Sequence, residues 1–129
     1  MSPDSLPKIF DRADGRQFDY VFNCGGETRF SQDDEIYKLR VVKLAESIGN
    51  EAAKRGVKAF VQLSSGHVYK GDSVPRKETD KLKPAIKLAQ YQLKADEALL
   101  KIEGFVVPLL SCIPLLYAGT DAENFADLI

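Results

Sequence analysis

The stretch VKAFVQLSSGHVY, residues 57–69, carries the clearest fold signal in the sequence. Apolar residues alternate with polar ones along it, and Phe60 makes both faces of the run partly apolar. A short run of this kind is typical of a strand in a parallel sheet that helices cover on both faces. Two serines and a glycine end the run. Because ligands bind outside the carboxyl ends of strands in open α/β sheets, we expect a functional site there.

Strand and helix patterns alternate on both sides of this run. Hydrophobic spacing, cap signals and turn residues predict the flanking elements. They are a strand at 18–24, a helix from a capping box at 31–34 to Gly56, a helix from Pro84 to Gly104, and a strand that starts at Phe105. Crossovers of this length join parallel strands with a right-handed connection. The sequence therefore predicts three parallel strands and two long helices, which is half of a doubly wound α/β domain.

The bulk properties describe one domain, residues 1–129, with 18 basic and 19 acidic side chains. A net charge of −1 offers no field for nucleic acid or for a membrane surface. Cys24 and Cys112 both lie in apolar runs, so buried free thiols are favoured over a disulfide. One histidine and no ligand spacing predict no metal site. The N-terminus has no signal-peptide pattern, and prolines break the longest apolar stretch, so we expect a cytoplasmic protein.

FVQLSSGHVY, residues 60–69, closely resembles the fifth-strand signature of the extended short-chain dehydrogenase/reductase family, the NAD-dependent epimerase/dehydratase group. Members read there as an apolar strand, Ser-Ser or Ser-Thr, two variable residues and Val-Tyr-Gly; here Lys70 precedes the glycine. Three further segments resemble the family in the same order: YVFNCGG at 20–26, VPRKET at 74–79 and KADE at 94–97. The resemblance covers roughly residues 17–107, leaves 108–129 as a divergent tail, and implies a partial Rossmann-like domain.

The resemblance also implies a reaction and a set of site residues. The family transfers a hydride at a carbon that bears a hydroxyl, with a tyrosine as acid or base and a lysine that lowers the tyrosine pKa and holds the ribose. Ser65 matches the serine that orients the substrate oxygen, and Gly66 and His67 would contact the small-molecule substrate beside it. Lys94 matches the lysine. The cofactor, NAD or NADP, would lie against Lys94 and the strand end formed by Asn23, Cys24 and Gly25.

The tyrosine position is ambiguous. Gln90 lies four residues before Lys94, where the family has its tyrosine, and Tyr91 lies three before it. Residues three and four apart are both neighbours on a helix, so Tyr91 is the candidate acid or base if a local bulge or π-turn rotates it inward. If Gln90 occupies the position instead, its amide does not titrate and the family's mechanism fails.

The sequence leaves two functions open. No glycine-rich G-x-x-G-x-x-G turn occurs in the chain, so we expect its independent cofactor binding to be impaired. In one interpretation the chain is the truncated catalytic half of an NAD(P)-dependent epimerase, dehydratase or reductase acting on a sugar nucleotide or a similar alcohol. In the other it is a non-catalytic remnant or an interaction module. Its open edge strand at 18–24 would then recruit a second copy or a partner chain.

Overall fold

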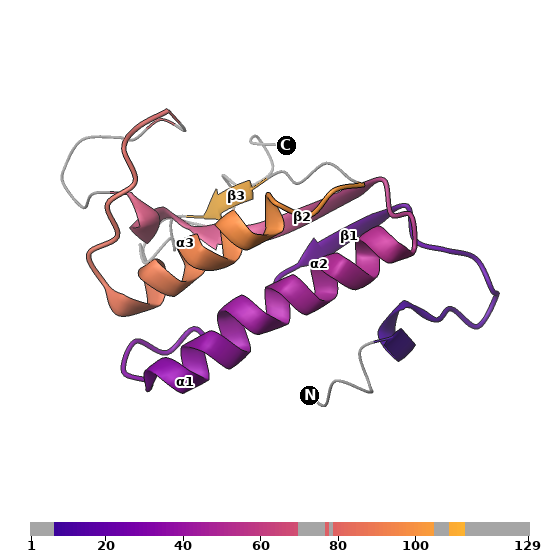
Figure 1. The fold of residues 1–129 in the computed structure, drawn as a ribbon, viewed down its shortest axis with the longest axis horizontal. Coiled ribbons are helices and arrows are strands. Elements are labelled where there is room, and N and C mark those ends of the chain that lie inside the picture. Colours follow the sequence, from indigo (N-terminus) through magenta and orange to yellow (C-terminus); the bar gives the residue numbers. More distant parts are fainter. Residues whose placement is uncertain (1–6, 70–76, 78, 105–108, 113–129) are drawn as a thin grey trace, which may run out of the picture.

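Three parallel strands and two long helices form the part of the chain that the structure describes, namely residues 7–69, 77, 79–104 and 109–112 of a computed structural model. The strands are β1 (Tyr20–Asn23), β2 (Ala59–Ser65) and β3 (Leu109–Cys112), in the order β1-β2-β3. Both neighbouring pairs are parallel. The fold is therefore α/β with half of a doubly wound sheet, as predicted (Figure 1).

The first crossover is one continuous helical stretch that changes type along its length (Figure 1). It consists of α1 (Asp34–Tyr37), a π-helical segment (Lys38–Lys43) and α2 (Leu44–Lys54). The predicted capping box is wrong: Asp33 is the N-cap residue, and its side chain makes no capping hydrogen bond. The predicted end is confirmed, because Gly56 has a φ of 71°, in the left-handed region that glycine adopts without strain.

The second crossover contains α3 (Lys87–Leu99), which is α-helical throughout. The prediction that this helix runs from Pro84 to Gly104 is wrong at both ends. Its N-cap residue is Ile86, and short turns follow directly after Leu99. In these turns the Ile102 amide donates to the Leu99 carbonyl, and the Ile102 side chain packs against the core. The third strand is present as β3 (Leu109–Cys112), and the predicted start at Phe105 falls outside the described residues.

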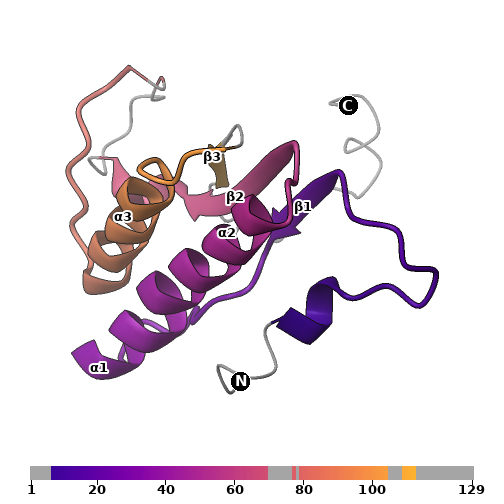
Figure 2. The ribbon, with the colours of Figure 1, turned by 45° about the vertical axis from the view of Figure 1, so that its right-hand side comes forward.

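Both long helices pack on the same face of the sheet (Figures 1 and 2). The apolar residues between them form one buried cluster, whose largest fully buried members are Tyr37, Phe60, Leu99 and Val57. Gly49 of α2 is buried where α2 meets α3, and a Cβ built there would lie 2.5 Å from Leu99 Cδ2. A glycine at this position therefore allows the two helices to approach closely.

The opposite face of the sheet is open in the described part of the chain, although the sequence predicted helices on both faces. Tyr20 and Phe22 are 62% and 70% exposed, and Leu63 of the neighbouring strand is 36% exposed. Side chains alternate along a strand, so Cys24 follows Tyr20 and Phe22 onto this face. It is an exposed free cysteine, and the prediction that its thiol is buried is wrong.

Candidate functional site

Ser65 is fixed at the carboxyl end of β2 by the turn that follows it. It is the N-cap residue of a short 3-10 turn, Gly66–Val68, and the backbone N–H of His67 donates to Ser65 Oγ over 3.2 Å. The same oxygen lies 3.0 Å from His67 Nδ1. Ser65 is buried and His67 is partly exposed. The three residues that the sequence predicted at the substrate, Ser65, Gly66 and His67, therefore form one hydrogen-bonded turn.

A second, buried hydroxyl ties this strand end to α3. Ser64 Oγ donates to Asp96 Oδ2 over 2.5 Å, and both residues are buried. Burial raises the pKa of Asp96 to about 6; the Ser64 hydrogen bond lowers this pKa, and the nearby charge of Glu97 raises it. Asp96 Oδ1 has no hydrogen-bond partner among the described atoms. Sequence reasoning missed this pair, although the alternation along β2 already places Ser64 and Phe60 on the same face.

The tyrosine beside Lys94 lies in the core between the two helices. Tyr91 is 6% exposed, and its ring stacks on Tyr37 with 5.5 Å between the ring centroids. Burial raises its pKa, with further contributions from the charge and hydrogen bond of Asp34. The Lys94 ammonium lies 4.5 Å from the Tyr91 ring centroid, which is a cation–π contact. Lys94 therefore contacts the face of this ring.

Gln90 is exposed on the same helix, one position before Tyr91. The rotation that would bring Tyr91 into the position of Gln90 needs a bulge or a π-turn, and α3 has neither between Lys87 and Leu99. The π-helical segment of this chain lies in the other crossover. The structure thus brings Tyr91 and Lys94 together, and a catalytic role of Tyr91 stays a prediction.

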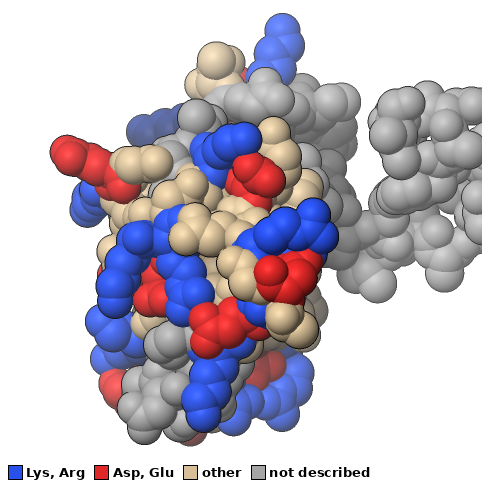
Figure 3. All heavy atoms as spheres, turned by 90° about the vertical axis from the view of Figure 1, so that its right-hand side faces the viewer, with Lys and Arg blue, Asp and Glu red and all other residues tan. Residues whose placement is uncertain are grey.

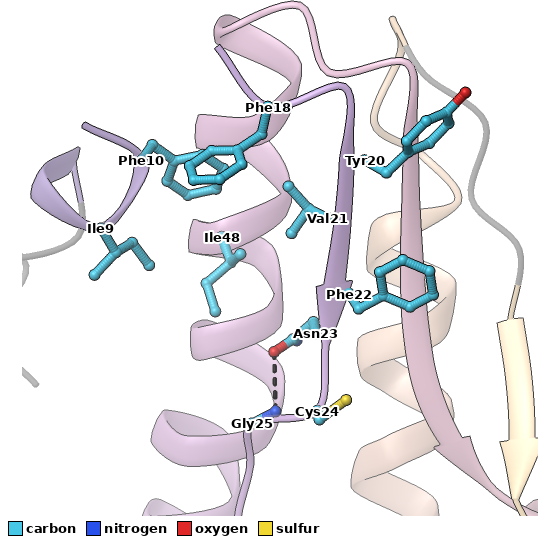
Figure 4. Close-up of a pocket in the computed structure, with 10 residues that line it drawn as sticks. All are labelled: Ile9, Phe10, Phe18, Tyr20, Val21, Phe22, Asn23, Cys24, Gly25 and Ile48. Carbon is cyan, nitrogen blue, oxygen red and sulfur yellow. Dashed lines mark hydrogen bonds between the residues drawn. The ribbon is translucent and has the colours of Figure 1, made fainter. Parts of the chain in front are cut away.

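The end of β1 holds the residues predicted at the cofactor. Asn23 is buried, its Nδ2 donates to Gln62 Oε1 over 2.8 Å, and its Oδ1 accepts from the Gly25 backbone N–H over 3.1 Å. Both polar groups of the Asn23 side chain are therefore engaged within the protein. Cys24 and Gly25 are exposed and line one end of a groove of about 350 Å³ (Figure 4).

This groove follows β1, and side chains from three segments line it. Figure 4 shows Ile9 and Phe10 of the N-terminal 3-10 turn, Ile48 of α2 and residues of β1 around it. The lining is mainly apolar, and Ser65 is not part of it. Asn23, Cys24 and Gly25 thus lie at the end of one strand and the residues predicted at the substrate at the end of its parallel neighbour, and the groove adjoins only the former. Lys94, also predicted at the cofactor, lies on α3.

A carboxylate organises the loop between β1 and α1. Glu27 is buried and accepts hydrogen bonds from the backbone N–H groups of Thr28 and Arg29. It also pairs with the guanidinium groups of Arg29 and Arg40, and the Arg29 hydrogen bond is the largest cause that lowers the pKa of Glu27, to about 2. The Phe30 ring of the same loop meets the His67 ring edge to face, with 6.3 Å between the centroids. The loop after β1 therefore contacts the turn after β2.

Two other classes of site are absent from the described part of the chain. None of its helices is long and apolar enough to cross a membrane, and no group of three potential metal ligands comes together there. On the face drawn in Figure 3, basic and acidic side chains are interspersed.

The fold and the strand-end residues define half of a doubly wound α/β domain of the dinucleotide-binding type. Residues 2–101 match the NAD dependent epimerase/dehydratase family. The chain belongs to that family, and the resemblance seen in the sequence is thereby confirmed. A search of curated protein sequences gave no significant match.

Solved structures with the same fold include MoeE5 in complex with UDP-glucuronic acid and NAD, with a TM-score of 0.73 and 18% identity. UDP-glucuronic acid 4-epimerase from Bacillus cereus has a TM-score of 0.69 and 15% sequence identity. UDP-N-acetylglucosamine 4-epimerase from Methanobrevibacter ruminantium has a TM-score of 0.68 and 18% sequence identity. The matches cover 86%, 82% and 82% of this chain but 39%, 34% and 35% of those chains. This chain therefore spans little more than a third of the length of these proteins.

The family is NAD-dependent, and the described residues fit that cofactor only in part. Lys94, Cys24 and Gly25 are exposed and available for contacts. A helix N-terminus for the pyrophosphate is missing from this strand end, because the loop of Glu27 intervenes and α1 begins only at Asp34. The part of the chain that the structure describes thus has no cradle for the phosphates.

Proposed function

We propose that this chain supplies the substrate-side half of an NAD-dependent epimerase, dehydratase or reductase site for sugar nucleotides, and that its activity alone is impaired. The observation that carries the proposal is the position of Ser65, a hydroxyl held at the carboxyl end of β2. Ligands of open α/β sheets bind at this edge. The nucleotide sugars named for the similar structures favour the same substrate class.

Each predicted residue then has a role that its surroundings support to a different degree. Ser65 orients the substrate oxygen, and Gly66 and His67 border the same space. Lys94 has an exposed ammonium and binds the ribose or a phosphate oxygen of the nucleotide. Asn23 positions the backbone at Cys24 and Gly25 through its own hydrogen bonds, and these two residues border the cofactor.

Two features account for the impairment. The Gln90 amide does not exchange a proton near neutral pH, so it does not replace a tyrosine. Tyr91 is the alternative acid or base, but burial raises its pKa, whereas the family's chemistry needs that pKa lowered. When bound, NAD supplies the hydride acceptor. The described residues offer it contacts at Lys94 and at the end of β1 but no cradle for its phosphates.

A titration with half of the cofactor tests this assignment. Nicotinamide mononucleotide lacks the adenosine half, so we expect it to bind the chain weakly and about as well as NAD when followed by NMR. Lys94→Ala should weaken both ligands several-fold, because an exposed cation–phosphate contact is lost. Lys101→Ala, an exposed lysine just after the same helix, is the matched control. Binding of NAD more than about tenfold tighter than the mononucleotide would show a site for the adenosine half and contradict the proposal.

A second function is supported by the open side of the sheet. β1 has one strand neighbour in the described structure, and Tyr20 and Phe22 project from its uncovered face. Edge strands with exposed apolar side chains pair with other strands. We therefore also propose that a second copy or a partner chain covers this edge, which would make the protein an interaction module whether or not it is catalytic.

A further inference from the structure

The proposed function leaves one proton without an acceptor. Oxidation of a substrate alcohol releases the hydroxyl proton, and in this chain Gln90 cannot take it. Tyr91 has a raised pKa, and its ring lies against Tyr37. The titratable side chain that the structure hydrogen-bonds to Ser65 is His67. Histidine exchanges protons near neutral pH and is the commonest general acid or base in enzymes.

Two contacts join Ser65 and His67 within the turn. The backbone N–H of His67 donates to Ser65 Oγ, so this oxygen already accepts one hydrogen bond. The same oxygen lies 3.0 Å from His67 Nδ1, and its rotatable O–H donates to Nδ1 when that nitrogen is unprotonated. With Nδ1 as the acceptor, the neutral ring carries its proton on Nε2. The contact from the His67 backbone N–H is an ordinary cap of the turn. The contact with Nδ1 adds an acceptor for the serine proton.

The ring is held in this position from outside the turn. Phe30, from the loop after β1, meets the imidazole edge to face, with an interplanar angle of 72°. The carboxylate of Glu27 anchors that loop through the backbone N–H groups of Thr28 and Arg29. Val68, at the end of the same turn, is buried. His67 is thus a partly exposed ring whose Nδ1 is directed at the buried Ser65 hydroxyl.

We propose that His67 is the proton acceptor for Ser65 and stands in for the tyrosine that Gln90 replaces. This inference rests on the proposed function. The substrate O–H bond breaks and its proton moves to Ser65 Oγ, while the Ser65 proton moves to His67 Nδ1. The ring becomes an imidazolium and releases the Nε2 proton to solvent. The two electrons of the substrate C–H bond leave with the hydride, for which a bound nicotinamide would supply the acceptor; in the reducing direction the proton path reverses.

The proton transfer is measured without substrate or cofactor by labelling Ser65 with phenylmethanesulfonyl fluoride. The Ser65 oxygen forms a bond to sulfur, fluoride leaves, and His67 takes the serine proton. We expect a single adduct at Ser65, located by peptide mass mapping, that forms at least about tenfold faster in the wild type than in His67→Gln. The His67→Gln variant keeps the backbone N–H that caps Ser65, and Ser64→Ala, one residue away, should react like the wild type.

The hydrogen bond itself is tested by NMR, because His67 is the single histidine of the chain. In protein with ¹⁵N-labelled histidine, the Nδ1 signal of the neutral ring should shift on Ser65→Ala and stay in place on Ser64→Ala. An unchanged Nδ1 signal in Ser65→Ala would overturn the proposal. So would equal labelling rates in the wild type and His67→Gln, or the absence of an adduct at Ser65.

These measurements separate the proposal from the function on which it rests. Slow labelling of Ser65 together with binding of nicotinamide mononucleotide would overturn the role of His67 and leave the proposed function in place. Fast, His67-dependent labelling without mononucleotide binding would support the proton acceptor and contradict the dinucleotide site.

Discussion

At the residue scale, the most consequential side chain outside the predicted site is Asp96. It places a carboxylate between β2 and α3, hydrogen-bonded to Ser64, with its second oxygen unpartnered among the described atoms. A buried carboxylate favours its neutral form, which is why its pKa rises to about 6. Ser64 and Ser65 are adjacent, so this buried pair lies at the strand end that carries the site.

The pH dependence of stability follows from this pKa with a definite sign. Between the ordinary aspartate value of 3.8 and about 6, the folded protein keeps a proton that the unfolded chain has released. The free energy of unfolding contributed by Asp96 therefore falls as pH rises through this window, by roughly 2–3 kcal/mol at most. The asparagine of the Asp96→Asn variant does not titrate, so the variant should not show this decrease in the free energy of unfolding.

The measurement is urea unfolding at several pH values across that window, comparing wild type and variant. The difference between the two profiles isolates Asp96 from the other acids. Glu103→Gln, which changes an exposed acid beyond the end of α3, should keep the wild-type profile. An Asp96→Asn profile parallel to that of the wild type would show that Asp96 keeps an ordinary pKa in the folded protein.

At the scale of elements, the contact between α2 and α3 depends on Gly49. A methyl group there would overlap Leu99 Cδ2 and lie 3.0 Å from Ile102 Cδ1. Leu99 is fully buried, so its side chain has little room to move. The two helices cover the face of the sheet that faces the core, and α3 also positions Lys94 and Asp96.

We expect Gly49→Ala to lower the free energy of unfolding by roughly 1–2 kcal/mol. Overpacking costs about 1–3 kcal/mol, and alanine returns up to about 1 kcal/mol of helix propensity. Denaturant unfolding measures the change. Asn50→Ala, at the adjacent exposed position, should stay within about 0.5 kcal/mol of the wild type. A Gly49→Ala variant as stable as the wild type would mean that the helices separate without cost.

The sequence predicted the order of elements and the strand-end serine because both follow from local patterns. Hydrophobic spacing located both crossovers, and Gly56 ends the first of them at the predicted residue. Helix starts were less predictable, since Ser31 has the right chemistry for a cap but Asp33 takes the position. The π-helical segment has no comparable signal in the sequence.

The details of the site could not be read from local patterns, since they arise from packing between elements. Helical spacing leaves Tyr91 as a candidate acid or base, but only the position of Tyr37 shows that its ring is buried. Cys24 lies in an apolar run and is exposed, because the described helices cover one face of the sheet. The bond between Ser64 and Asp96 joins residues 32 positions apart.

At the scale of the whole molecule, β1 has an uncovered face and a free edge in the described part of the chain. Tyr20 and Phe22 are among its most exposed large apolar side chains, and the apolar groove runs along the same strand. Leu39, in the π-helical segment, is similarly exposed at 64% but lies on the first crossover. This difference in location provides a matched pair of substitutions.

We expect the wild-type chain to self-associate or to bind a partner through this strand, and Phe22→Glu to shift it toward monomer. A charge on the open face makes close approach of a second apolar surface costly. Sedimentation velocity at several concentrations measures the distribution, and Leu39→Glu should leave it unchanged. A wild-type chain that is monomeric at every concentration, with a sharp thermal transition, would contradict the interaction module.

The parallel arrangement of the strands also bears on the order in which the elements fold. Asn23 and Gln62, hydrogen-bonded side by side on β1 and β2, are 39 positions apart, and the whole first crossover lies between them. A parallel pair of this kind forms only after the intervening chain has closed a long loop, and such non-local pairings fold slowly. We expect the helix of the first crossover, built on local hydrogen bonds, to form before the sheet. The strand end that holds Ser65 should then be assembled late, after that helix has formed.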